Sequence, residues 1–209
     1  MGRRKKEAPS AHREHIAAAA AQLFQARGID GASMDEIAQA AGYSKATLYV
    51  YFANKQEIVS LLALQSMQMM YECIAQALAQ PDNIRACYRR LCQNLLQYQA
   101  EKPFFFQMVL TKINGLAEGQ PCLPEEKSTY EVGEEINRLL VDYLLAGVAK
   151  GELRPDLKPL PTIFSLWGML SGLIQLANNK ELYISQAMEL PKEQFLTYGF
   201  QLLYSSIAS

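Results

Sequence analysis

The spacing of the apolar residues limits the possible folds of this sequence more than any other feature. Apolar side chains recur every three or four positions along almost the whole chain, which is the period of a helix with one buried face. No run alternates for long enough to predict a strand. The sequence therefore predicts an all-α fold. The first stripe shows the pattern clearly: Ile16, Ala19, Ala20, Leu23 and Phe24.

Helix start and stop signals divide this pattern into segments. We expect Ser10 to cap a first helix that ends near Arg27, with Gly28 as the stop. Ser33 and Glu36 form the sequence pattern of a capping box. The expected helices span about 10–27, 34–41, 45–52, 58–79, 83–102, 103–113, 127–150, 159–178 and 191–207, and residues 115–126 form the expected mobile loop.

Two short helices joined by Ala41-Gly42-Tyr43-Ser44 predict a helix-turn-helix, whose second helix enters the DNA major groove. At about 100° per residue, Leu48 and Phe52 share the buried side of that second helix. By spacing alone, a helical hairpin with surface tyrosines remains an alternative. The predicted groove-facing residues are Ala46, Thr47 and Val50, and those predicted to reach phosphates are Lys45, Tyr49, Tyr51 and Lys55.

Charge is distributed unevenly along the chain. Up to Lys55 there are eight Lys and Arg residues against five acids, whereas the whole chain has 20 against 21. A basic N-terminal part suits a DNA-binding module. The basic residues at positions 3–6 are either an arm that lies along DNA or a solvated tail that binds it only non-specifically.

The segment 41–55, together with 28–38, resembles the signature of the tetracycline-repressor (TetR) family. The resemblance covers roughly residues 10–60, and it departs from the usual family pattern at Ala46 and Tyr51. It implies an all-α homodimer with an N-terminal three-helix DNA-binding domain (1–55, with a basic arm at 1–9) and a helical-bundle ligand-binding and dimerisation domain (56–209). The residues that match the family's DNA-contacting positions are Ser33, Ser44, Lys45, Ala46, Thr47, Tyr49, Tyr51 and Lys55.

Glycines inside the last two long helices indicate close helix packing, because an interior glycine costs about 1 kcal/mol relative to alanine. One interpretation is a four-helix dimer interface, where the family usually dimerises, and the other is packing within one chain. The candidate interface residues are Gly168, Gly172, Leu176, Phe195, Gly199, Phe200 and Leu203.

The family resemblance also implies a pocket for a small lipophilic effector. Methionine and aromatic residues of the second domain are candidate lining residues, although each is as readily a core residue. They are Met67, Met70, Tyr71, Tyr98, Phe104, Phe105, Phe106, Met108, Tyr143 and Trp167.

Other classes of function have little support. The cysteines at 73, 87, 92 and 122 form no metal-binding spacing and suit a reduced cytosolic core, with redox sensing as the alternative. Uninterrupted apolar runs are shorter than a membrane span. We expect no catalytic residues, cofactor, metal or membrane partner, and a cytoplasmic location.

The sequence thus predicts a DNA-binding transcriptional regulator, not an enzyme. The leading hypothesis is a repressor that binds a palindromic operator as a dimer and is released by a small lipophilic ligand. The alternative is an architectural or division-control protein of the same fold, regulated by a protein or DNA partner.

Overall fold

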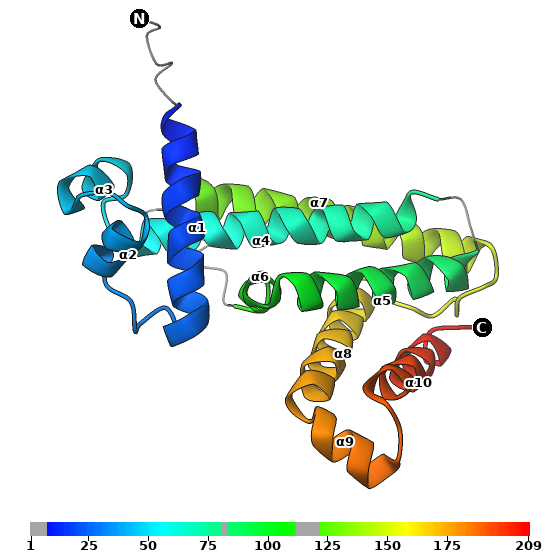
Figure 1. Cartoon of the computed structure of the whole chain (residues 1–209). Helices are drawn as coiled ribbons and strands as arrows, with labels where there is room; N and C mark the ends of the chain where they lie inside the picture. Colours follow the sequence, from blue (N-terminus) through cyan, green and yellow to red (C-terminus); the bar gives the residue numbers. More distant parts are fainter. Residues whose placement is uncertain (1–7, 81–82, 112–121) are drawn as a thin grey trace, which may run out of the picture. The chain divides into compact units, whose positions relative to one another are not determined.

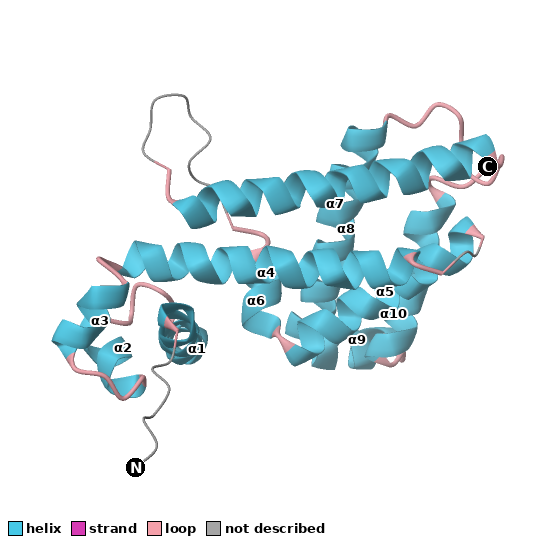
Figure 2. Ribbon diagram, turned by 90° about the horizontal axis from the view of Figure 1, so that it is seen from above, coloured by secondary structure: helices cyan, strands magenta, loops and turns pink. Residues whose placement is uncertain are grey.

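The computed structural model describes residues 8–80, 83–111 and 122–209, and it confirms the all-α fold (Figures 1 and 2). Within these residues, helices are joined by loops and no strand is present. The chain divides into two compact units, residues 1–69 with 102–132 and residues 70–101 with 133–209. These units reflect contacts within the folded chain. The boundary after residue 55, between the DNA-binding and the ligand-binding domain, therefore stays a prediction.

The first unit begins with α1 (Pro9–Arg27), α2 (Met34–Ala40) and α3 (Lys45–Tyr51). Ser10 is not the cap of α1, as the sequence had suggested. Pro9 occupies the first turn instead, where its missing N–H removes a donor that would have no helical partner. At the other end of α1, Gly28 has a φ of 76° that favours glycine.

The start of α2 is the predicted capping box. The Ser33 hydroxyl accepts a hydrogen bond from the Glu36 N–H at 3.3 Å, and the Glu36 carboxylate accepts one from the Ser33 N–H at 2.9 Å. Gly42 then turns the chain between α2 and α3 with a φ of 71°. The capping box thus fixes the start of α2, and the glycine turn separates α2 from α3.

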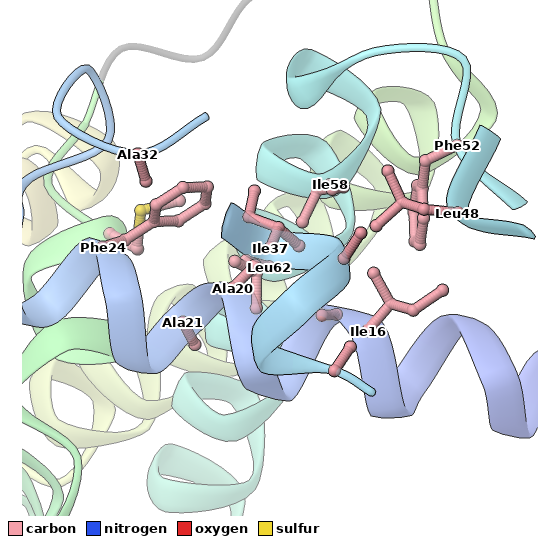
Figure 3. Packing of buried hydrophobic residues seen from close by; sticks show 14 residues of the cluster. Ile16, Ala20, Ala21, Phe24, Ala32, Ile37, Leu48, Phe52, Ile58 and Leu62 are labelled. Atoms are coloured by element: carbon pink, nitrogen blue, oxygen red, sulfur yellow. The ribbon is translucent and has the colours of Figure 1, made fainter. Parts of the chain in front are cut away.

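A single apolar core holds these helices in place (Figure 3). Leu48 and Phe52, at the end of α3, are fully buried together with Ile16 of α1 and Ile37 of α2. Burial of each such side chain contributes about 1.5–3 kcal/mol. One face of α3 is therefore fixed by the core, and its other face remains in solvent.

The remaining helices differ from the predicted ones in several places, and the helix expected at Ile58 begins at Lys55. A short helix at 181–188, in which only Ile184 is buried, was not predicted. The helix at 103 ends at Met108, earlier than expected, and the one expected at Lys127 begins at Pro124. Of the expected mobile loop, residues 115–121 lie outside the described residues. The helices are α4 (Lys55–Leu78), α5 (Ile84–Glu101), α6 (Pro103–Met108), α7 (Pro124–Ala149), α8 (Pro159–Asn179), α9 (Glu181–Met188) and α10 (Lys192–Ser205).

In the second unit, α8 and α10 lie side by side (Figure 1). A Cβ atom built on Gly199 of α10 would lie 2.4 Å from a methyl carbon of Leu173 on α8. Glycine at this position thus allows the two helices of one chain to approach closely. After α10, Leu153 and Ala208 form an isolated antiparallel bridge that holds the chain end.

Two helices are long and apolar enough to cross a membrane by length and composition alone, although uninterrupted apolar runs are short. They are α4 and α8, with mean hydropathies of 1.3 and 1.4 over an 18-residue window. In α4, Ile58 and Leu62 are buried in the N-terminal core, and Ser60 and Ser66 are buried polar residues. Core helices of globular proteins pass the same test, so this feature is weak support for a membrane segment.

Candidate functional site

The outer face of α3 is exposed to solvent in the described residues. Val50 is 77% exposed and Tyr49 45% exposed, and Lys45 and Ala46 are also exposed. Leu48, on the opposite side, is fully buried. The orientation that helical spacing predicted for these side chains is therefore confirmed.

Ser44 and Thr47 hold the first turn of α3. The Ser44 hydroxyl accepts a hydrogen bond from the Thr47 N–H at 3.1 Å, and the two hydroxyl oxygens lie 2.8 Å apart. Serine caps of this kind stabilise a helix by about 1 kcal/mol. Thr47, which is half-buried, is thus partly engaged in capping as well as placed near the groove-facing side.

An acidic residue that the sequence of α3 alone did not predict lies near the exposed face of this helix. Lys45 forms an ion pair with Asp35 of α2 at 2.8 Å, and this contact raises the pKa of the lysine. Both side chains are more than 60% exposed, so solvent screens the pair. Lys45 can therefore exchange this carboxylate for another anion at little cost.

Tyr51, which the sequence predicts to reach phosphate, packs against His12 of α1. Its ring lies 5.2 Å from the ring of His12 and 6.4 Å from that of Tyr43. The physical reason is its position three residues after buried Leu48, on the same side of the helix. Its contact with phosphate stays a prediction.

Lys55, at the start of α4, is half-buried and contacts the backbone. Its ammonium group donates hydrogen bonds to the carbonyl oxygens of Ile29 and Ala32, at 2.7 and 3.0 Å. These bonds use two of its three donor hydrogens and hold the loop between α1 and α2. Lys55 thus has a structural role besides the phosphate contact predicted for it. Ser33 is likewise engaged in its capping box.

The candidate pocket residues do not gather in one place. The first unit holds Met67, Phe105 and Met108, of which Met67 and Met108 line one cavity of about 60 Å³ between α4, α6 and α7. The second unit holds Met70, Tyr71, Tyr98, Tyr143 and Trp167, as the division into units shows.

Tyr143 and Trp167 line another cavity of about 60 Å³, which is almost entirely apolar. Tyr143 donates a hydrogen bond to the Ile84 carbonyl at 2.9 Å, and burial raises the pKa of its hydroxyl above the usual range. A larger open groove of about 530 Å³ lies between α5 and α10, with Arg85 and Arg89 on its rim. None of the predicted pocket residues lines this groove.

The candidate interface residues fall into two groups. Gly168, Gly172 and Leu176 lie on one exposed side of α8, and open space surrounds a Cβ built on either glycine. Gly199 and Phe200 are buried inside their own chain, which is the intrachain packing that the sequence left open. Phe195 and Leu203 are half-buried. Sequence reasoning missed three exposed apolar residues next to this set: Phe164, Tyr198 and Leu202.

The cysteines are mostly core residues. Cys73, Cys87 and Cys92 are buried, and burial raises the pKa of Cys73 and of Cys92 to about 12. The thiols of Cys73 and Cys92 stay protonated at neutral pH, which leaves them poorly reactive. Cys122 is exposed, in contrast to the predicted core role. The basic arm at residues 3–6 lies outside the described residues.

Comparison with known proteins identifies the N-terminal region. Residues 16–62 match the model of the bacterial regulatory proteins of the tetR family, and this segment contains α2, α3 and most of α1. Residues 16–62 thus form a region of the TetR-family type. The match falls on the same residues that carry the helix-turn-helix, so the family resemblance is confirmed.

Two curated relatives of the TetR family extend the match. The chain is 33% identical over 93 residues to the HTH-type transcriptional regulator TtgR of Pseudomonas putida, covering 44% of each chain. It is 25% identical to the HTH-type transcriptional repressor KstR2 of Mycolicibacterium smegmatis over 71% of each chain. The aligned region thus spans less than half the length of TtgR. Both names are those of transcriptional regulators.

The whole chain shares its fold with solved TetR-family structures. The regulator PfmR of Thermus thermophilus matches 91% of this chain and 97% of its own, with 24% identity and a TM-score of 0.67. A Rhodococcus protein of unknown function matches all of both chains with a TM-score of 0.77 at 17% identity. These similarities confirm a helical C-terminal region of the family type and show the fold alone.

Proposed function

We propose that this chain is a transcriptional regulator that binds operator DNA with α3 in the major groove. The observation that supports this most directly is the exposed outer face of a helix whose inner face is locked into a core. Val50, Ala46 and Thr47 face the bases, and Tyr49 and Lys45 reach phosphates on either side. In a bacterial cell, such a protein acts in the cytoplasm, where the chromosome lies.

The regulator binds as a dimer to a palindromic site. Two recognition helices read such a site when they are separated by about one DNA turn or a multiple of it. The dimer surface we propose is the exposed side of α8 with the adjoining side of α10, because these present Phe164, Leu176 and Leu202 to solvent.

The DNA-binding proposal is tested by recovering bound fragments from the genome and measuring affinity for the site they define. Thr47→Ala should change the preference among related DNA sites. Lys45→Ala should weaken binding to all of these sites alike, and it should reduce the slope of log affinity against log salt concentration by about one, the contribution of one phosphate contact. Lys45 is the better phosphate test than Lys55, since Lys55→Ala also releases the Ile29 and Ala32 carbonyls. Equal binding of all sequences by the wild type would contradict the proposal.

We further propose that a small lipophilic ligand releases the protein from its operator. The apolar cavity beside Tyr143 and Trp167 is the supporting feature. The ligand acts by binding better to a form in which the two recognition helices are wrongly spaced for DNA. A screen of lipophilic compounds for raised melting temperature, followed by release of labelled operator DNA, tests this step.

A second candidate is an architectural or division-control protein that needs no effector. The two cavities that the predicted pocket residues line favour it, since each holds about 60 Å³, far below the roughly 300–1,000 Å³ of typical ligand sites. If no compound both stabilises the protein and releases DNA, this second candidate gains support. Bound sites spread over the chromosome, away from promoters, would favour it further.

A further inference from the structure

Arg13 of α1 contacts the C-terminal end of the recognition helix. Its Nη1 donates a hydrogen bond to the backbone oxygen of Tyr51, the last residue of α3, at 2.8 Å. The final carbonyl groups of a helix have no partner within the helix, and a cation beside them is favourable. Arg13 therefore satisfies an acceptor that α3 cannot satisfy itself.

The same guanidinium group also lies over the next side chain. Its central carbon is 4.3 Å from the centre of the Phe52 ring, and Phe52 is fully buried. Cation–π contacts of this kind fix the plane of the guanidinium group as well as its position. The end of α3 is thus held by Arg13 through both its backbone and the adjacent aromatic ring.

The second terminal nitrogen of Arg13 points to another element. Nη2 forms an ion pair with Oε1 of Glu125, in the first turn of α7. The two side chains are only 29% and 18% exposed, so this pair is screened less than the surface pairs of the chain. The N-terminal end of α7 also favours a carboxylate at this position.

We propose that Glu125 is a positioning residue for DNA recognition, acting through Arg13 to hold the C-terminal end of α3. The proposal rests on the proposed DNA-binding function. Because the guanidinium donors form a rigid planar fork, a shift of the Glu125 carboxylate changes the bond from Arg13 to Tyr51. The orientation of the recognition helix is then set partly by a residue on α7, outside the helix-turn-helix.

The first turn of α7 also borders the cavity lined by Met67 and Met108. Glu126 and Thr129 line this cavity, and the Ser60 hydroxyl lies 3.4 Å from Glu126 Oε1. Glu125 therefore contacts Arg13, whereas the neighbouring Glu126 lines the cavity. Any molecule that binds in this cavity and displaces the first turn of α7 would shift Glu125. Through the ion pair between Glu125 and Arg13, it would change the contact between Arg13 and the end of α3.

The test compares Glu125→Gln with Glu131→Gln in the full chain. Glu131 lies on the same helix, is exposed and pairs only loosely with Lys127 at 3.8 Å, so its substitution removes the same charge without touching α1. Loss of a negative charge near DNA tends to tighten binding. We expect Glu125→Gln to weaken operator binding about 3- to 30-fold instead, a change of opposite sign, while Glu131→Gln leaves affinity equal or tighter.

A double-mutant cycle and hydrogen exchange separate positioning from charge. Arg13→Lys keeps the charge but lacks the planar fork, and adding Glu125→Gln to it should cause little further loss. In the free protein, the amides of residues 48–53 should exchange faster in Glu125→Gln than in Glu131→Gln. Should Glu125→Gln fold poorly, Glu125→Asp, which withdraws the carboxylate by one methylene, gives the same comparison at unchanged charge.

The proposal is overturned if Glu125→Gln binds operator as tightly as Glu131→Gln and its α3 amides exchange at the wild-type rate. If instead the wild type binds no specific DNA, the proposed function fails, and the exchange measurement still decides whether Glu125 holds α3.

Discussion

The first three helices and the last three differ in how many of their large apolar side chains are exposed to solvent. In α1–α3, the large apolar side chains that stand in solvent are Tyr49 and Val50, both on α3. In α8–α10 a whole series is exposed. The first region buries its apolar side chains in a core that Ile58 and Leu62 of α4 help to close, and it leaves one small face free. The second region leaves apolar surface of the kind that usually marks an interface. That series is Leu160, Phe164, Met169, Leu176, Leu182, Tyr183, Met188, Tyr198 and Leu202.

The largest effect should come from the completed core. Phe52→Ala removes a fully buried ring and should lower the free energy of unfolding of the N-terminal domain by about 3–5 kcal/mol. Val50→Ala, two residues earlier and 77% exposed, should change it by less than about 0.5 kcal/mol. Denaturant unfolding of both variants measures the contrast, and similar losses would show that α3 has no distinct buried and exposed faces.

The next largest effect concerns the exposed apolar surface of α8 and α10. Phe164→Glu combined with Leu202→Glu should weaken dimerisation at least about 100-fold, equivalent to about 2.7 kcal/mol, because charges replace apolar contacts. Leu145→Glu on α7, where the leucine is 52% exposed, serves as the control. Sedimentation at micromolar concentration should show monomers for the double variant alone. A dimer of unchanged affinity would place the interface elsewhere.

The glycines sharpen the comparison inside α8 and α10. Gly199→Ala should destabilise the folded chain by about 1–3 kcal/mol, since its Cβ would overlap Leu173. Gly168→Ala and Gly172→Ala meet open space and should each stabilise the helix by up to about 1 kcal/mol. If a partner helix approaches there, the same two variants should weaken dimerisation, and thermal unfolding with sedimentation separates the two effects.

The smallest effect is expected at the α2 cap. Ser33→Ala should cost about 1 kcal/mol of stability. The hydrogen bond from the Ser33 backbone, with smaller contributions from the Ser33 hydroxyl and Arg27, lowers the pKa of Glu36 below its ordinary value of 4.5. A carboxylate with a lowered folded-state pKa stabilises above its unfolded-state pKa, and this stability is lost as pH falls through the folded-state value.

The dependence of the melting temperature on pH tests this prediction. Melting temperature followed from pH 7 downwards should fall less steeply in Glu36→Gln than in the wild type once the pH drops below about 4.5. A parallel decline in both proteins would mean that the capping box contributes nothing to acid stability. The exposed pair of Arg154 and Asp156 offers a matched control far from α2 in the sequence.

Much of the N-terminal domain could be predicted because its signals are local. The capping box at Ser33, the turn at Gly42 and the cap at Ser44 depend on residues within a few positions of one another, and all are present in the structure. The buried side of α3 follows from helical spacing. Prediction erred at Ser10, where competing local residues decided the cap, and it did not foresee the packing of Tyr51 against another helix.

The sequence by itself thus determined an all-α chain and the outer face of the helix-turn-helix that contains Val50, because periodicity and capping are properties of adjacent residues. Only the tertiary structure decided which partners those residues meet. It placed Asp35 beside Lys45, the Ile29 carbonyl on Lys55, and Arg13 between the end of α3 and Glu125. The physical reason is that these contacts join segments up to 112 positions apart, whose proximity follows from packing of the core and from no local pattern.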